Sequence, residues 1–133
     1  MPGISILVVD DDQIYRYMAN KMLLATGLAD DLTFCKNGAE AWNFLEEKIL
    51  KNVNLPDFIF LDINMPVMNG WELLKKITPF IKKANQKIAI YIVTSSQDEK
   101  DIKHSAQIDF ISGYLVKPVL SQTFLEILSS TKY

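Results

Sequence analysis

The stretch that decides the fold is the apolar run Ile4-Ser5-Ile6-Leu7-Val8-Val9, which stops at Asp10-Asp11. Three further apolar runs also end at a polar residue: Phe58 to Leu61 at Asp62, Ile88 to Val93 at Thr94, and Tyr114 to Val116 at Lys117. Near-continuous hydrophobic runs are typical of strands in a parallel sheet whose two faces are covered by helices. Such sheets place their chemistry beyond the carboxyl ends of the strands. We therefore expect three carboxylates, a hydroxyl and an ammonium group to converge at one edge.

Amphipathic stretches with helical spacing alternate with these runs. The first is Gln13 to Thr26, ended by Gly27, and its predicted inward positions are Ile14, Met18, Met22 and Ala25. Four capping signals predict the starts of the other helices: Asn37 with Glu40, Asn69 with Glu72, Ser96 with Glu99, and Ser121. Leu32 to Cys35 supplies a short additional strand. Pro79 is expected to break or kink the third helix.

Five strands alternating with five helices predict a doubly wound α/β domain with a five-stranded parallel sheet in the order 2-1-3-4-5. The chain has 133 residues, 49% of them hydrophobic, which suits one globular domain with a hydrophobic core. We therefore expect residues 1–133 to form a single domain. Its one switch point lies between the first and third strands, where Asp10-Asp11 and Asp62 would stand side by side.

Composition excludes several classes of function. The net charge is -2 at pH 7 and the basic residues are scattered, which argues against a nucleic-acid partner. Cys35 is the only cysteine, so the chain has no internal disulfide and no cysteine metal cluster. The first strand begins at Ile4, which leaves no room for a signal peptide, and Ile88 to Val93 is too short to span a bilayer. We expect a cytoplasmic protein with no membrane partner.

Three carboxylates at one edge repel one another, so the site must recruit positive charge or hold a proton. A divalent cation together with Lys117 would offset the three formal negative charges of Asp10, Asp11 and Asp62, and ligation by oxygen alone suits Mg²⁺ or Mn²⁺. Asp62 is then the candidate nucleophile toward a phosphoryl group, and Thr94 can donate a hydrogen bond to that group. Each residue alone would be an ordinary polar group at a strand end, so their joint occurrence carries the prediction.

The motifs at these strand ends resemble a known family, the receiver domain of two-component response regulators, which has a flavodoxin-like (CheY-like) fold. The resemblance covers essentially the whole chain, with the motifs in the family's order. It rests on four segments: Ile6 to Asp12, Leu61 to Pro66 with Asn69-Gly70, Val93 to Ser95, and Tyr114 to Pro118.

The resemblance implies that Asp62 accepts a phosphoryl group from a histidine kinase or a histidine phosphotransfer protein and becomes an aspartyl phosphate. It also implies a Mg²⁺ (or Mn²⁺) site. Asp11 and Asp62 would be direct ligands of the ion, Asp10 would act mostly through water, and Asn64 would contribute its backbone carbonyl.

The resemblance assigns roles at the other two strand ends as well. Thr94 and Lys117 would contact the phosphoryl group, and Pro118 matches a proline that follows the lysine through a cis peptide bond. Tyr114 matches the family's switch aromatic, which turns inward when Thr94 moves toward the phosphoryl group. The output surface would then be the face built by the fourth helix, the fifth strand and the fifth helix.

These implications make the chain a bacterial phosphoprotein that signals to a downstream protein, either as a monomer or as a phosphorylation-linked dimer. Any enzymatic activity would be limited to self-phosphorylation from a phosphodonor and self-dephosphorylation. We expect a stand-alone regulator; the alternative is a receiver within a longer regulator or a hybrid kinase. A small aspartyl-nucleophile phosphatase is disfavoured, because Asp10 to Ile14 lacks the final Thr of Asp-x-Asp-x-Thr. A degenerate receiver that only binds partners is disfavoured by the complete set of acidic, hydroxyl and lysine residues.

Overall fold

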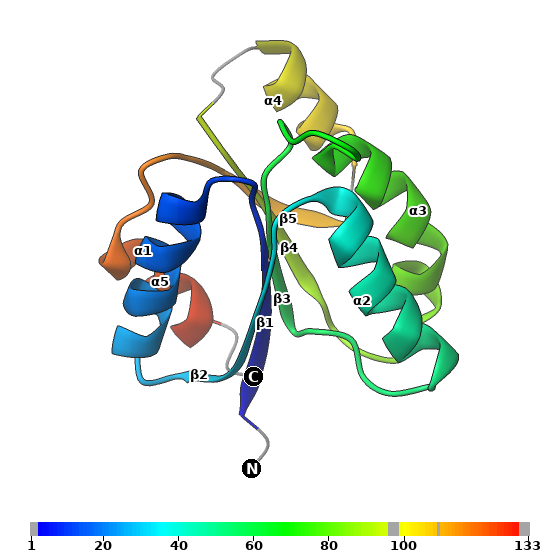
Figure 1. Cartoon of the computed structure of the whole chain (residues 1–133), viewed down its shortest axis with the longest axis horizontal. Coiled ribbons are helices and arrows are strands. Elements are labelled where there is room, and N and C mark those ends of the chain that lie inside the picture. The colour runs from blue at the N-terminus through cyan, green and yellow to red at the C-terminus, as the bar shows by residue number, and fades with distance from the viewer. Residues whose placement is uncertain (1–2, 96–98, 109, 131–133) are drawn as a thin grey trace.

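A computed structural model describes residues 3–95, 99–108 and 110–130 of the chain. Its central element is a parallel sheet. Five strands pair in the order β2-β1-β3-β4-β5, and this confirms the predicted fold class (Figure 1). The strands are β1 (Ile4–Val9), β2 (Ala29–Cys35), β3 (Phe58–Leu61), β4 (Ala89–Thr94) and β5 (Ile111–Val116). The sequence therefore predicted β1 and β3 with their observed bounds, whereas β2 and β5 each begin three residues earlier than expected.

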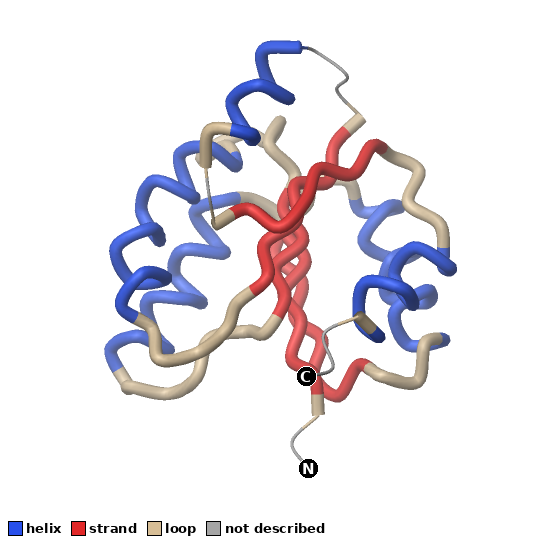
Figure 2. Tube along the Cα trace, turned by 180° about the vertical axis from the view of Figure 1, so that it is seen from behind, coloured by secondary structure: helices blue, strands red, loops and turns tan. Residues whose placement is uncertain are grey.

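Helices cover both faces of the sheet, as the view from behind also shows (Figure 2). Two helices, α1 (Gln13–Ala25) and α5 (Ser121–Ser129), lie on one face. The other face carries α2 (Gly38–Leu50) and α3 (Gly70–Lys83), while α4 (Glu99–Ala106) lies near the carboxyl ends of the strands. The functional residues predicted from the sequence lie at or just beyond the ends of β1, β3 and β4 and in or just after the edge strand β5.

Alternation along β1 divides its side chains between two cores. Ile6 and Val8 join the core under α1 and α5, whereas Leu7 and Val9 join the core under α2 and α3. All four residues of β3 are buried, as a central strand between two helical layers requires. This rigid centre fixes where β1 and β3 end.

The predicted inward face of α1 is wrong at Ile14, Met18 and Ala25, which are exposed, and right at Met22, which packs half-buried against the core. Ile14 and Met18 are 71% and 52% exposed, and the buried residues of this helix are Ala19 and Leu23. Tyr15 packs against the same core as Leu23. Apolar residues lie on several sides of this helix, so helical spacing alone is compatible with more than one buried face. Packing against α5 and the sheet selects the face that carries the small Ala19 and Leu23.

Helix starts and stops agree with the sequence in part. Asn37 and Asn69 cap α2 and α3 as predicted, and Asn69 forms a full capping box with Glu72. Pro79 does not break α3, which continues to Lys83; Ile81, beyond the proline, packs partly buried against the core under α2 and α3 and holds the last turn there. Ser121 is the first helical residue of α5 rather than its cap, because Leu120 occupies the cap position. Ser96 lies outside the described residues.

Candidate functional site

Strand register brings the predicted site residues to one edge. Val9 of β1 pairs with Leu61 of β3, so Asp10 and Asp62 leave the sheet side by side, and the Asp62 amide donates to the Val9 carbonyl at 2.9 Å. On the other side, the Lys117 amide donates to the Thr94 carbonyl at 2.9 Å. Carboxylate oxygens of Asp10, Asp11 and Asp62 lie within 4.8 Å of one another. The convergence expected from the four apolar runs is therefore present.

Lys117 is the positive charge inside this cluster. Its Nζ lies 2.6 Å from Asp10 Oδ2 and 3.7 Å from Asp62 Oδ2. Asp10 is 1% exposed and Asp62 is 5% exposed, whereas Asp11 is exposed. Lys117 therefore forms its closer ion pair with the buried Asp10, and Asp11 faces solvent.

One lysine does not neutralise three carboxylates. Burial, together with the neighbouring Asp10 charge, raises the pKa of Asp62 to about 6, although Lys117 opposes both effects. Burial also raises the pKa of Asp10 and outweighs the contact of that residue with Lys117. An all-oxygen cluster with surplus negative charge and one solvent-exposed carboxylate fits a hard divalent cation such as Mg²⁺ or Mn²⁺.

The loop between β3 and α3 shapes the surroundings of Asp62. Asp62 Oδ1 accepts a hydrogen bond from the Asn64 amide at 3.2 Å. Gly70 opens α3 so close to this turn that a Cβ atom there would lie 2.6 Å from the Asp62 carbonyl oxygen. Val67 has a positive φ of 71°, which is uncommon for a β-branched residue and marks a strained turn. The loop therefore holds Asp62 through close backbone contacts.

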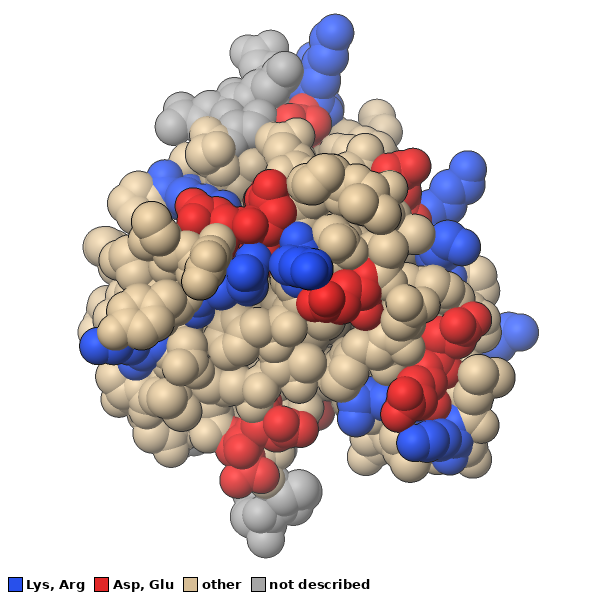
Figure 3. Space-filling view, in the orientation of Figure 1, with Lys and Arg blue, Asp and Glu red and all other residues tan. Residues whose placement is uncertain are grey.

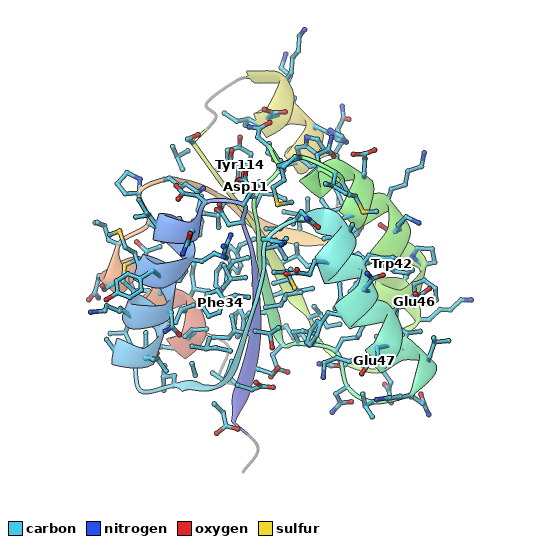
Figure 4. All side chains as sticks on the ribbon, in the orientation of Figure 1. Asp11, Phe34, Trp42, Glu46, Glu47 and Tyr114 are labelled. Carbon is cyan, nitrogen blue, oxygen red and sulfur yellow. The ribbon has the colours of Figure 1, made fainter. Side chains whose placement is uncertain are left out.

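The predicted switch residues lie beside this loop. Thr94 is fully buried, and its hydroxyl accepts a hydrogen bond from Asn64 Nδ2 at 3.5 Å. Tyr114 pairs with Ile92 of β4 and packs, half-buried, against the core under α2 and α3. Asp11 and Tyr114 lie toward the same end of the molecule (Figure 4). Asn64 thus links the turn after Asp62 to Thr94, while its carbonyl remains a predicted metal ligand.

Two residues of α1 belong to the site although the sequence did not indicate them. The guanidinium of Arg16 donates to the Asp10 carbonyl at 2.6 Å. Lys117 Nζ lies 4.4 Å from the centroid of the Tyr15 ring. The sequence feature that could have indicated them is their place in the first turn of α1, about one helical turn after Asp11 and Asp12. Side chains in this turn lie close to the carboxyl end of β1. The Lys117–Pro118 peptide bond is cis, as predicted.

Surface charge and the hydropathy of the helices bear on the expected partners. Figure 3 shows Lys and Arg scattered over the visible face rather than gathered in one patch. Among the described residues, no helix is both long enough and apolar enough to cross a membrane.

The chain matches the response regulator receiver domain family over residues 6–129. A chemotaxis protein CheY homolog of Campylobacter jejuni is 32% identical over 123 residues, which cover 92% of this chain and 88% of that protein. A two-component response regulator of Cytophaga hutchinsonii superposes with a TM-score of 0.84 at 28% identity, covering 97% of this chain and 96% of that one. The Mn²⁺-bound form of response regulator Rcp1 superposes with a TM-score of 0.74 at 25% identity, covering 97% and 91%.

The chain therefore belongs to the response regulator receiver domain family of two-component systems. This membership confirms the resemblance inferred from the four sequence segments. It also removes the support for the phosphatase alternative.

Proposed function

We propose that this receiver takes a phosphoryl group on Asp62 from a histidine kinase or a histidine phosphotransfer protein and signals by changing shape. The observation that carries the proposal is the position of Asp62 at the central switch point, with Lys117 Nζ 3.7 Å from its carboxylate and Thr94 linked to the adjacent turn through Asn64. Asp10 and Asp11 stand beside it but follow the neighbouring strand.

The transfer forms one bond and breaks one bond. An Asp62 carboxylate oxygen attacks phosphorus, the P–O bond of the aspartyl phosphate forms, and the P–N bond of the donor phosphohistidine breaks, leaving its electron pair on the imidazole. Lys117 is placed to pair with an equatorial phosphoryl oxygen, and the Thr94 hydroxyl can donate to another. Positioning and charge neutralisation therefore account for the role of each residue.

We further propose that Asp11, Asp62 and the Asn64 carbonyl hold Mg²⁺ or Mn²⁺, with Asp10 acting through water. When bound, the ion supplies positive charge to the phosphoryl oxygens. With three carboxylates and one lysine, the cluster has a formal charge of two negative units, which a divalent cation offsets. With the ion sharing the negative charge of the cluster, the ion pair between Lys117 and Asp10 would be weaker.

The exposed side of α1 is the surface we propose for the phosphodonor protein. Ile14, Tyr17 and Met18 are each more than half exposed, and α1 begins three residues after Asp10. A donor histidine must reach Asp62 directly, so its protein must cover the surface around the cluster. Exposed apolar side chains beside such a site are suited to a protein contact.

Phosphorylation mapping tests the proposed function. The chain would be incubated in Mg²⁺ with acetyl phosphate or, separately, with each of a panel of phosphorylated histidine kinases, and then trapped with borohydride before peptide mass spectrometry. We expect label on Asp62 alone with acetyl phosphate and with the cognate kinase. Label on Asp10, or no label from any donor, would contradict the proposal. An Asp31→Asn variant, which changes an exposed carboxylate on the outer strand β2 and keeps the three carboxylates of the cluster, should still be labelled on Asp62.

The output of the site is proposed to be the α4, β5 and α5 face. Phosphorylation replaces one carboxylate charge with about two negative charges, so Thr94 gains by moving toward the new oxygens and leaves space for Tyr114. A modification shifts the equilibrium between two conformations only because it stabilises one more than the other. We therefore expect the unphosphorylated chain already to sample the active conformation as a minority.

Thr94→Ala is expected to accept the phosphoryl group on Asp62 but to lose most of the response. The variant keeps the nucleophile and the acidic cluster but lacks the hydroxyl that senses the new oxygens. Amide chemical shifts of α4 and β5, recorded with and without a phosphoryl mimic, measure the response in the parent and the variant. Thr94→Ser, which keeps the hydroxyl, is the matched control. Equal shifts in Thr94→Ala and the parent would remove Thr94 from the switch.

A further inference from the structure

The lysine of the site has an aromatic neighbour that the proposed chemistry does not use. Lys117 Nζ lies 4.4 Å from the centroid of the Tyr15 ring, in addition to its contacts of 2.6 Å and 3.7 Å with Asp10 and Asp62. A cation within about 6 Å of a ring centroid is attracted by the negative face of the ring. Three partners, two carboxylates and one ring, therefore define the position of this ammonium group.

Tyr15 is itself held firmly. The Asp12 side chain caps α1 and accepts hydrogen bonds from the Ile14 and Tyr15 amides at 2.9 Å and 3.3 Å. The Tyr15 ring packs against the core under α1 and α5, which contains Val8 and Phe124. Its hydroxyl oxygen is buried and has no hydrogen-bond partner among the described residues. The ring is therefore fixed by its backbone and by packing rather than by its hydroxyl group.

We propose that Tyr15 is a positioning residue for Lys117, whose ammonium group keeps contact with the ring while it turns from Asp10 toward a phosphoryl group on Asp62. This inference rests on the proposed phosphorylation of Asp62. A charge-assisted hydrogen bond to a carboxylate requires a donor–acceptor distance of about 2.7–2.9 Å, whereas a cation is attracted to a ring at any position over its face within about 6 Å of the centroid. The ring can therefore retain the lysine at both ends of this movement.

The ring acts through its face and not as a charge. Burial raises the pKa of Tyr15, and the charges of Asp10 and Asp62 raise it further, so the phenol stays neutral at pH 7. Phenylalanine would provide the same face, whereas leucine would provide only apolar contact. This difference separates a positioning role from simple core packing.

Three variants test the proposal: Tyr15→Phe, Tyr15→Leu and the control Tyr91→Leu. Tyr91 packs against the same core and stacks on Phe60 at 5.6 Å. Its replacement removes a comparable aromatic ring and leaves Lys117 and its partners intact. The rate of Asp62 labelling by acetyl phosphate in Mg²⁺ is measured for each variant. Folding is checked by urea unfolding, so that rates are compared only under conditions where each variant is folded.

We expect Tyr15→Leu to be labelled about threefold to tenfold more slowly than the parent, and Tyr15→Phe to retain the rate within about twofold. Tyr91→Leu should also retain it. A Tyr15→Phe rate as low as that of Tyr15→Leu would overturn the proposal, because the ring face would then not be the relevant feature. A Tyr15→Leu rate equal to that of Tyr91→Leu would overturn it as well.

A second readout does not depend on phosphorylation. Protons near an aromatic face are shifted upfield by the ring current, so the Lys117 ε-methylene protons should be upfield in the parent and in Tyr15→Phe, and lose that shift in Tyr15→Leu. An unchanged shift in Tyr15→Leu contradicts the proposed arrangement. If the parent accepts no phosphoryl group while the ring-current shift behaves as expected, the proposed function fails and the Tyr15–Lys117 contact stands.

Discussion

Asp62→Asn is expected to raise the free energy of unfolding at pH 7, without divalent cation, by about 1 to 3 kcal/mol. The same substitution should abolish acceptance of a phosphoryl group, because the amide lacks the nucleophilic oxygen. In the parent chain, burial and the adjacent Asp10 make ionisation of Asp62 unfavourable. An amide of the same shape removes one of three crowded negative charges and leaves Lys117 with Asp10.

The pKa of Asp62 determines how the stability difference between Asp62→Asn and the parent should change with pH. The pKa of Asp62 is about 6 in the folded chain, against an ordinary value of 3.8. Between these values the folded chain binds more protons than the unfolded chain, so the contribution of Asp62 to stability is present below pH 3.8 and is lost as the pH rises through about 6. The difference between Asp62→Asn and the parent should therefore be small at pH 4 and largest at pH 7.

Urea unfolding of both proteins at pH 4, 5 and 7 in a chelating buffer measures this difference. Asp31→Asn, which changes an exposed carboxylate on the outer strand β2, is the matched control and should change stability little. A variant at Asp62 that is no more stable than the parent at pH 7 would contradict the proposed electrostatic conflict.

The sequence predicts the strand edge well for a physical reason. A strand buried on both faces must be nearly all apolar, so the first polar residue marks where the chain leaves the core. Val9 followed by Asp10 and Leu61 followed by Asp62 are such boundaries, and the structure places both at the same edge. Doubly wound topology then requires that these boundaries converge.

The face of α1 could not be predicted in the same way. Ile14 and Met18 have the spacing of a buried stripe, yet they are exposed, while Ala19 and Leu23 are buried. Hydrophobicity does not distinguish a side chain that packs in the core from one left at the surface beside a functional site. The contact between Tyr15 and Lys117 joins residues 102 positions apart, at 4.4 Å, and no local pattern encodes it.

The charge balance of the cluster distinguishes its three carboxylates. Asp10 is buried and lies 2.6 Å from Lys117, while Asp62 is buried and lies 3.7 Å from the same ammonium group. Asp11 is exposed, and the described part of the chain gives it no ion pair. Asp11 is therefore the carboxylate that can bind a cation without first giving up a lysine.

Asp11→Asn is accordingly expected to weaken Mg²⁺ binding at least tenfold and to slow Mg²⁺-dependent labelling of Asp62 by a similar factor. The substitution removes a hard anionic ligand and leaves a cluster whose remaining carboxylates are both engaged by Lys117. Amide-shift titration with Mg²⁺ measures the affinity, and labelling by acetyl phosphate measures the rate.

Asp12→Asn is the matched control for this prediction. It removes the same charge one residue away, and asparagine caps a helix as well as aspartate does, so α1 should keep its start at Gln13. Its affinity for Mg²⁺ should stay within about threefold of the parent, because Asp12 lies outside the cluster of three carboxylates and acts only through weak, screened attraction. Equal losses in Asp11→Asn and Asp12→Asn would mean that the cation responds to general surface charge, and the direct ligand role of Asp11 would be wrong.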